Sequence, residues 1–197
     1  MNLAALNVVA RAKAILANPV AAWAQIEKDA GDPAYLLRTY VAVLALIPAL
    51  AGFVGASLIG VILPGGATAR ASLFNGAASA IFGYVMTCAT VLALGLIINA
   101  LAPPFGGRRD FNNAFKLAVY SFTPVWIAGI FLVLPGLWFL VLTGSYGAYL
   151  LWLGVPRLAK MPEGQAANFT AVIVTWALVL LFITAVAQRA VFGTSGF

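Results

Sequence analysis

The sequence predicts an all-α integral membrane protein with five transmembrane helices, preceded by short interfacial amphipathic helices. Of its 197 residues, 63% are hydrophobic and only 8% are charged, whereas an ordinary soluble domain has roughly 25% charged residues. The apolar residues gather in runs of about 20, the length that a helix needs to cross a hydrocarbon layer of roughly 30 Å. These runs lack the two-residue alternation of a membrane β-barrel, so helices are the expected solution.

Residues 1–35 are expected to form a cytoplasmic interfacial helical segment, because the stretch mixes apolar and charged positions without an uninterrupted span. Asn18 is expected to cap a second short helix that begins at Pro19. A cleaved signal peptide is the alternative, but the leading stretch lacks a continuous apolar core of adequate length. Both helices would then lie along the inner leaflet. The side chains expected to enter the leaflet are Leu6, Ile15, Val20, Trp23 and Ile26, and those expected at the headgroups are Arg11, Lys13 and Lys28.

Residues 36–192 are expected to form the five-span membrane domain, with residues 193–197 as an external tail. The third and fourth spans share one charge-free stretch from Leu117 to Pro156, which is too long for a single helix. Pro135-Gly136 supplies the break, because proline lacks the donor that continues a helix and glycine accepts turn dihedrals. We therefore expect a tight helical hairpin there. The expected spans are about 40–63, 73–102, 114–134, 136–155 and 169–190.

The loop "APPFGGRRDF" after the second span is expected to be a bend at the membrane surface. Pro103-Pro104 would end the span and Gly106-Gly107 would turn the chain. Arg108 and Arg109 would reach anionic headgroups, and Asp110 would cap the following helix or pair with an arginine. The loop lacks the spacing and the lysine of a Walker motif, so nucleotide binding is not expected.

The cations predict the orientation, because Lys and Arg in short loops tend to stay on the cytoplasmic side during insertion. Only Arg70 and Arg189 fall on the opposite side, so we expect a cytoplasmic N-terminus and an external C-terminus. Insertion alone then explains the net charge of +6, and no nucleic-acid partner is expected. All five acidic residues also fall on the inner side. The nine inner cations are Arg11, Lys13, Lys28, Arg38, Arg108, Arg109, Lys116, Arg157 and Lys160.

The residue types argue against catalysis. There is no histidine, the commonest general base and metal ligand. The single cysteine, Cys88, lies in mid-span without a partner for a disulfide, and a packing role is expected for it. The span interiors hold no charged residue apart from Lys116 and Arg189 near their ends, where both can reach the interface. We therefore expect no enzyme, no metal and no cofactor.

Small residues recur at intervals of four within the spans, which permits close helix contact. Such repeats are compatible with packing inside the protein and with self-association. The candidate packing residues are Gly52, Ala56 and Gly60 in the first span, Gly76, Ala80 and Gly83 in the second, where Ser79 and Thr87 share the spacing, and Gly144 and Ala148 in the fourth.

A second candidate is a polar cluster near a proline in the third span. Pro124 cannot donate to the carbonyl of Tyr120 and is expected to kink the helix, leaving that carbonyl to a hydroxyl, water or ligand. Ser121 and Thr123 lie within one turn, and Asn99 ends the second span. Two interpretations remain open: a kink satisfied internally, or a polar binding site formed by Asn99, Tyr120, Ser121, Thr123 and Pro124.

The run "IINALAPPFGGRRDFNNAFKLAVYSFTPVWIAGIFLVLPGL" resembles the bacterial branch of the Yip-domain family, which is related to the eukaryotic Ypt/Rab-interacting five-span membrane proteins. "RAKAILANPVAAWAQI", "YLLRTYVAVLALIPAL" and "YGAYLLWLGVPRLAKMPEGQA" are similar to the same family. The resemblance implies five helices, a cytoplasmic N-terminus and an external C-terminus. Eukaryotic relatives bind prenylated GTPases, but a bacterial cell has no Rab cycle and this N-terminal segment is short. A Rab-type GTPase is therefore not expected as the partner.

We therefore expect a non-enzymatic protein of the bacterial cytoplasmic membrane that binds other membrane components. It would organise the membrane or serve as an accessory subunit of a larger assembly. The alternative is a small transporter or lipid-handling protein with its polar site at the kinked third helix. Expected partners are membrane lipids, with anionic headgroups on the cytoplasmic side, and other integral membrane proteins or further copies of the chain. The candidate headgroup contacts are Arg11, Lys13, Arg108, Arg109 and Lys116.

Overall fold

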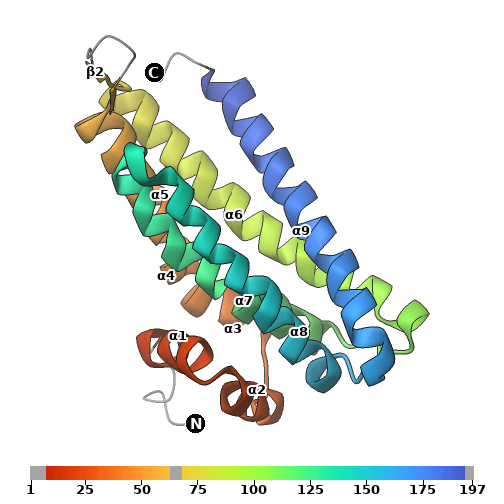
Figure 1. The fold of residues 1–197 in the computed structure, drawn as a ribbon. Helices are drawn as coiled ribbons and strands as arrows, with labels where there is room; N and C mark the ends of the chain where they lie inside the picture. Colours follow the sequence, from red (N-terminus) through yellow and green to blue (C-terminus); the bar gives the residue numbers. More distant parts are fainter. Residues whose placement is uncertain (1–7, 63–67, 194–197) are drawn as a thin grey trace.

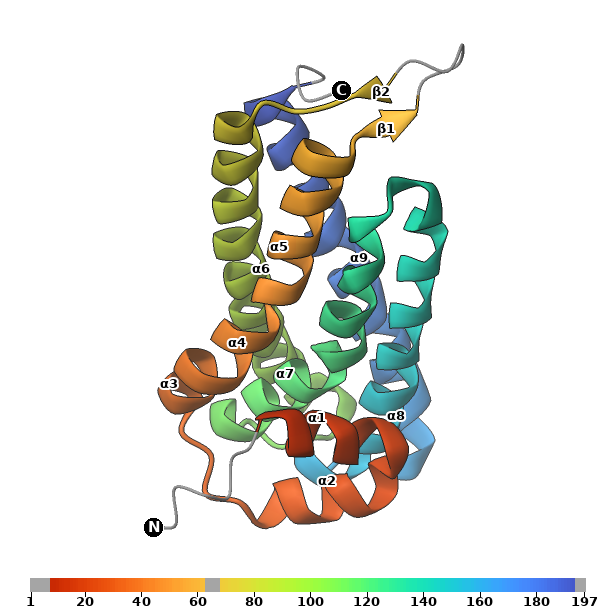
Figure 2. The ribbon, with the colours of Figure 1, turned by 90° about the vertical axis from the view of Figure 1, so that its left-hand side faces the viewer.

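The computed structural model describes residues 8–62 and 68–193, and within them five helical segments are long and apolar enough to cross a membrane. The expected all-α membrane fold is confirmed (Figure 1). The segments run alternately up and down, with two further helices lying across one end of the bundle (Figure 2). The five segments are Pro33–Ile59, Leu73–Leu101, Phe111–Val133, Gly136–Leu158 and Gly164–Phe192.

Two short helices, α1 (Val8–Ala17) and α2 (Pro19–Lys28), form what we call the cap. As expected, Asn18 precedes α2, and its side chain accepts a hydrogen bond of 3.3 Å from the backbone N–H of Ala21. The cap lies across the end of the bundle where α3 begins and α8 ends (Figures 1 and 2). We call this the cap end and the opposite end the far end.

The first span begins at Pro33, ahead of the expected residue 40, because Asp32 caps it and proline suits the first turn of a helix. It is irregular. Pro48 has no N–H for the carbonyl of Leu44, and the helix is divided at Ala45. The successive pieces are α3 (Pro33–Leu36), π-helical η2 (Leu37–Val41), α4 (Ala42–Leu44), α5 (Leu46–Phe53) and π-helical η3 (Val54–Ile59).

The first span does not extend to residue 63 as expected. Gly60 ends η3 with φ of +84°, a conformation that glycine adopts without strain. A short antiparallel ladder follows at the far end, in which β1 (Val61–Ile62) pairs with β2 (Thr68–Ala69). The second span, α6 (Leu73–Leu101), then returns to the cap end.

The loop after α6 forms the expected bend. The segment η4 (Pro103–Phe105) ends the helix, and Gly106 turns the chain in the left-handed region with φ of +81°. Asp110 caps the next helix by accepting a hydrogen bond of 3.1 Å from the backbone N–H of Asn113. These features confirm the expected helix end, the glycine turn and the Asp110 cap.

The third and fourth spans form the expected tight hairpin, with the chain extended at Leu134. Both arms tighten to 3-10 geometry beside this break. Pro124 lies inside α7, which remains α-helical to Ala128. The fifth span is a single long helix that ends at the far end. The elements are α7 (Phe111–Ala128), η5 (Gly129–Val133), η6 (Pro135–Ser145), α8 (Tyr146–Leu158) and α9 (Glu163–Phe192).

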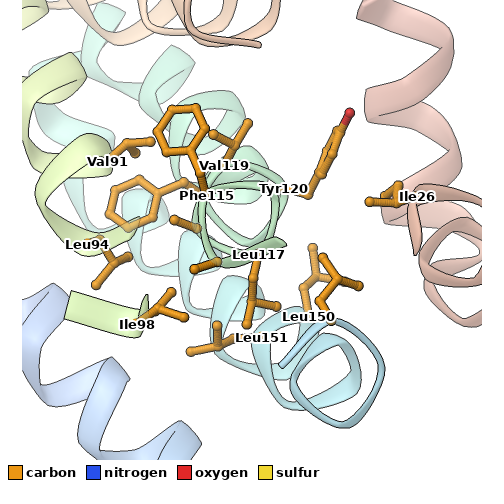
Figure 3. Packing of buried hydrophobic residues seen from close by; sticks show 14 of the residues in the cluster. Ile26, Val91, Leu94, Ile98, Phe115, Leu117, Val119, Tyr120, Leu150 and Leu151 are labelled. Carbon is orange, nitrogen blue, oxygen red and sulfur yellow. The ribbon is translucent and has the colours of Figure 1, made fainter. Parts of the chain in front are cut away.

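The core is centred on the third span, in which 67% of the most apolar window is buried, against 17% in the fifth span. Figure 3 shows Phe115, Leu117 and Val119 of α7 among side chains of α6 and α8. The fifth span therefore lies at the margin of the bundle, where most of its surface faces the membrane.

The cap helices pack on protein rather than on lipid, which corrects one expectation. Ile15, Trp23 and Ile26, expected to enter the leaflet, are fully buried in the core. Trp23 donates a hydrogen bond of 3.0 Å from Nε1 to the carbonyl of Leu150. Val20 does remain exposed, and Leu6 lies outside the described residues. Burial against α7 and α8 removes the same apolar surface from water that lipid contact would have removed.

Candidate functional site

The expected polar cluster of the third span is occupied by neighbouring side chains. Tyr120 is 3% exposed, and its ring centroid lies 5.0 Å from that of Tyr40 and 6.2 Å from that of Trp23. The Thr123 hydroxyl lies 2.9 Å from the Tyr40 hydroxyl and shares a hydrogen bond with it. Ser121 and Pro124 are also buried. Side chains thus surround Tyr120 and Thr123, while Pro124 lines a separate cavity of about 350 Å³ together with Thr143 and Tyr146.

Asn99 does not join this cluster. Gly95 of α6 lies level with Phe115 of α7, since a Cβ on Gly95 would be 2.9 Å from the Phe115 ring. From this level, Asn99 lies towards the cap end and Tyr120 towards the far end. A helical rise of 1.5 Å per residue separates Asn99 and Tyr120 by roughly 13 Å along the bundle.

Four buried side-chain atoms have no hydrogen-bond partner among the described residues, but they do not converge on one site. Ser121 and Trp126 both lie on α7, where their spacing places them about 140° apart around the helix. The other two belong to different spans. The four atoms are Ser57 Oγ, Asn99 Oδ1, Ser121 Oγ and Trp126 Nε1.

Two of the expected headgroup contacts are engaged by the protein itself. Lys116 is 4% exposed, and its ammonium donates to the backbone carbonyls of Ile26 and Asp29 and to the side chain of Asn113. Arg11 is paired with the Asp29 carboxylate. Both expectations are corrected, because the cap brings acceptors to these cations that the sequence does not reveal. Lys13, Arg108 and Arg109 remain exposed at the cap end, where lipid contact stays a prediction.

Further ion pairs hold the cap. Glu27 on α2 pairs with Lys160 and with Arg157, both near the end of α8. The hydrogen bond from Lys160 holds the pKa of the Glu27 carboxyl below its usual value. The cap is therefore tied to both hairpin arms by charged contacts as well as by apolar packing.

The small residues divide into two groups. A Cβ on Gly144 would stand 3.0 Å from the Cα of Val125, so Gly144 permits close packing of η6 on α7. Its neighbour Ala148 is half-buried, and Gly60 serves the turn after η3. The remaining five line an open groove, and Gly76 also permits close packing, because a Cβ there would collide with Ser57 Oγ of η3. These five are Gly52, Ala56, Gly76, Ala80 and Gly83.

We define the α6 groove as the cavity of about 720 Å³ that has α6 as its floor and α5 and α9 as its walls. Both walls pack on α6 and scarcely touch each other, and Figure 1 shows α6 between them. Gly52 has no atom within 4 Å of the position where a Cβ would stand. The wall residues include Pro48, Ala49, Gly52 and Phe53 of α5, and Phe182, Ala185, Val186 and Phe192 of α9.

The groove extends from the far end to about the middle of the bundle. Asn75 lines its mouth and Thr87 its inner end, so it spans roughly 18 Å at the helical rise of 1.5 Å per residue. Half of a hydrocarbon layer is about 15 Å thick. The groove is therefore as deep as one leaflet. Near the inner end, Thr184 joins α9 to α6 through a hydrogen bond of 3.1 Å with Thr90.

Polar groups are few and lie mainly towards the mouth. Gln188 of α9 donates a hydrogen bond of 2.8 Å from Nε2 to the Ser79 hydroxyl of α6. Gly83 leaves room for this amide, because a Cβ there would stand 3.3 Å from Gln188 Oε1. Asn75 and Arg189 complete the mouth. The groove thus has an apolar interior with an amide and a cation at its mouth.

Of the residues that line the groove, the Ser79–Gly83–Thr87 spacing was recognised in the sequence, but Asn75 and Gln188 were not predicted. Gln188 could have been predicted, because it is a single amide in an otherwise apolar last span. Polar side chains in membranes usually face the protein interior or a cavity. The sequence does not predict that the groove is open, because small residues are compatible both with close helix contact and with empty space.

An all-α bundle of five membrane spans, capped by a docked N-terminal helix pair, defines the structural class of the protein. The chain belongs to the Yip1 domain family, whose model matches residues 13–186. The resemblance seen in the sequence is thereby confirmed.

Two relatives of the chain are both described as inner membrane proteins. "Inner membrane protein YohC" of Escherichia coli K12 is 28% identical over 136 residues, which cover 67% of this chain and 70% of that protein. The protein of the same name from Escherichia coli O6:H1 gives the same values. No solved structure matches the chain.

Proposed function

We propose that the protein is a non-enzymatic lipid-binding protein of the bacterial inner membrane, which holds one acyl chain of a membrane lipid in the α6 groove. The observation that carries the proposal is the groove itself. Its volume of about 720 Å³ lies within the 300–1,000 Å³ typical of small-molecule sites. Its depth of roughly one leaflet fits a chain that enters from the membrane surface.

The lining supports an acyl chain over a polar substrate. Apart from Gln188, Ser79 and two threonines, the inner part of the groove is formed by alanine, glycine and apolar side chains. A transported ion or sugar would require a polar path through the bundle, and the Tyr40–Thr123 region of the third span is packed instead. The lipid-handling alternative therefore gains support, with its site moved from the third helix to α6.

The inner membrane assignment draws on the Escherichia coli relatives, which carry that description. The positive-inside rule supports a cytoplasmic cap end, since that end holds nine of the eleven cations. The groove then opens to the outer leaflet. Holding a lipid there is compatible with a membrane-organising or accessory role in a larger assembly.

The small residues of the groove also suit a helix from a second copy of the chain, since close helix contacts in membranes use such residues. Lipid is favoured because both walls remain apart and the polar groups gather at one end. A transmembrane helix would present apolar side chains along its whole length. The two occupants give different results in the experiment below.

The proposal is tested by filling the groove. In Gly52→Leu the new side chain enters the groove, whereas in the control Gly136→Leu it enters open space elsewhere at the far end, since neither glycine has an atom near its Cβ position. Each variant is purified in mild detergent, and its retained phospholipid is measured by native mass spectrometry. We expect Gly52→Leu to lose most of the lipid that the wild type and Gly136→Leu retain.

Equal lipid retention by Gly52→Leu and Gly136→Leu would contradict the proposal. A wild-type dimer that becomes a monomer in Gly52→Leu, with no change in lipid per chain, would show that the groove holds a second copy instead. Thermal unfolding of both variants serves as the check that the five-span fold is intact.

A further inference from the structure

We infer that the α6 groove selects a phospholipid with an anionic headgroup, whose phosphate is bound by Arg189. This inference rests on the proposed function and adds the class of lipid. Arg189 lines the mouth of the groove one turn before the end of α9. Its side chain is exposed, so the guanidinium is accessible to a headgroup at the membrane surface.

The charge at the far end supports the inference. Arg70 and Arg189 are the two cations there, and all five acidic residues of the sequence belong to the cap end. Arg70 is held beside the groove, because its Nε donates a hydrogen bond of 3.2 Å to the carbonyl of Ile59, and the next residue, Ala71, lines the groove. The mouth therefore carries positive charge that no acidic side chain of the described residues offsets.

The neighbouring polar groups have separate roles. Gln188 is engaged with Ser79, so it stabilises the junction of α9 with α6 and orients the turn that bears Arg189. Asn75 of α6 and Arg189 of α9 both line the mouth. An arginine suits phosphate particularly well, because its planar guanidinium donates two parallel hydrogen bonds. The Asn75 amide, which lines the same mouth, offers a further donor to a headgroup oxygen.

The geometry also places the Arg189 cation next to the apolar space for an acyl chain. Arg189 lies at the membrane surface, while the apolar walls continue inward from Ala185 and Ala80. A diacyl phospholipid with its phosphate at Arg189 can therefore place one chain in the groove. A free phosphate ion would gain the cation but none of the apolar contact.

The test compares two lipids of equal chain composition. The wild type, Arg189→Gln and Arg189→Lys are reconstituted in bilayers of equal parts phosphatidylglycerol and phosphatidylethanolamine, extracted in mild detergent and examined by native mass spectrometry. We expect the wild type to retain phosphatidylglycerol preferentially. Arg189→Gln should reduce the retained ratio of phosphatidylglycerol to phosphatidylethanolamine about five-fold, the effect expected of one cation near an anionic lipid. Arg189→Lys should give an intermediate ratio.

A matched control separates this site from the cap end, where Arg38→Gln removes an exposed cation far from the groove. An unchanged ratio in Arg189→Gln, or an equal reduction in Arg38→Gln, would overturn the inference. If Gly52→Leu still removes lipid in that case, the proposed function stands without the headgroup preference. If Gly52→Leu retains all lipid, the proposed function fails and the inference fails with it.

Discussion

The ammonium of Lys116 on α7 donates a hydrogen bond of 2.6 Å to the backbone carbonyl of Asp29, at the C-terminal end of α2. A second bond of 3.3 Å reaches the carbonyl of Ile26. The last carbonyls of a helix lack partners within the helix, and a cation is favourable beside them. Lys116 therefore fastens the cap to the most buried span.

Replacing Lys116 by Met should loosen the cap without removing the five-span fold. The change leaves the carbonyls of Ile26 and Asp29 without a buried donor, which costs about 1–3 kcal/mol. Hydrogen exchange of residues 8–28 in detergent should become faster, while exchange in α7 changes little. Lys13→Met is the control, because Lys13 is exposed. Equal exchange in both variants would show that the lysine does not hold the cap.

Acidification should weaken the contact between α2 and the end of α8. Lys160 keeps the pKa of Glu27 below its usual value of 4.5, so the folded state binds this proton less readily than the unfolded state. The stabilising contribution is present above pH 4.5 and disappears as the pH falls through the lowered pKa. Exchange of α2 should therefore rise more steeply below pH 4.5 in the wild type than in Glu27→Gln. Identical profiles would exclude a role for this carboxylate.

The polar residues of the third span should matter for stability rather than for lipid binding. Thr123→Val removes the partner of the buried Tyr40 hydroxyl and should destabilise the protein by about 1–3 kcal/mol. Thermal unfolding should detect this loss, while the amount of retained phospholipid stays at the wild-type level. Asn99→Ala should likewise leave lipid retention unchanged. Loss of lipid from both variants would instead support a lipid site at the third span.

The elements that the sequence predicted well have strong local causes. Apolar run length determined the five spans, Pro135 the hairpin, Asn18 the start of α2 and Asp110 the start of α7. The start of the first span was misjudged because Asp32-Pro33 lies outside the apolar run, although both residues are good helix starters.

The site was less predictable, because it depends on contacts between distant segments. Lys116 resembles a snorkelling lysine until α2 is placed against it, and Trp23 resembles a lipid anchor until Leu150 is seen to accept its N–H. The closely packed glycines were predicted only in part: Gly76, where a Cβ would collide with Ser57 Oγ, was expected, whereas Gly154, where a Cβ would stand 2.5 Å from a Leu117 methyl group, was missed. A small residue allows a neighbour to approach, but only the packing of the helices determines whether one does.

The distribution of cations predicts the orientation of the spans. Reporter fusions after Phe197 should be active only outside the cytoplasm, and fusions within residues 156–168 only inside. A cytoplasmic C-terminal reporter would contradict the assigned orientation, and the groove would then open to the inner leaflet.

The exposed arginine pair at the cap end should bind anionic lipid independently of the groove. Each cation near the surface contributes about 1 kcal/mol of attraction to an anionic membrane. The double variant Arg108→Gln and Arg109→Gln should retain less phosphatidylglycerol than the wild type in native mass spectra at low salt, and the difference should shrink as salt screens the attraction, whereas lipid that Gly52→Leu removes should remain. Unchanged phosphatidylglycerol retention would leave this loop as a simple bend.

The central claim is that a lipid chain occupies the α6 groove, and a high-resolution structure of the wild type in a phospholipid nanodisc tests it most directly. We expect continuous elongated density from the mouth at Asn75 and Arg189 to Thr87, between α5 and α9. A groove closed by direct contact of α5 with α9, or filled by a helix of a second copy, would contradict the claim.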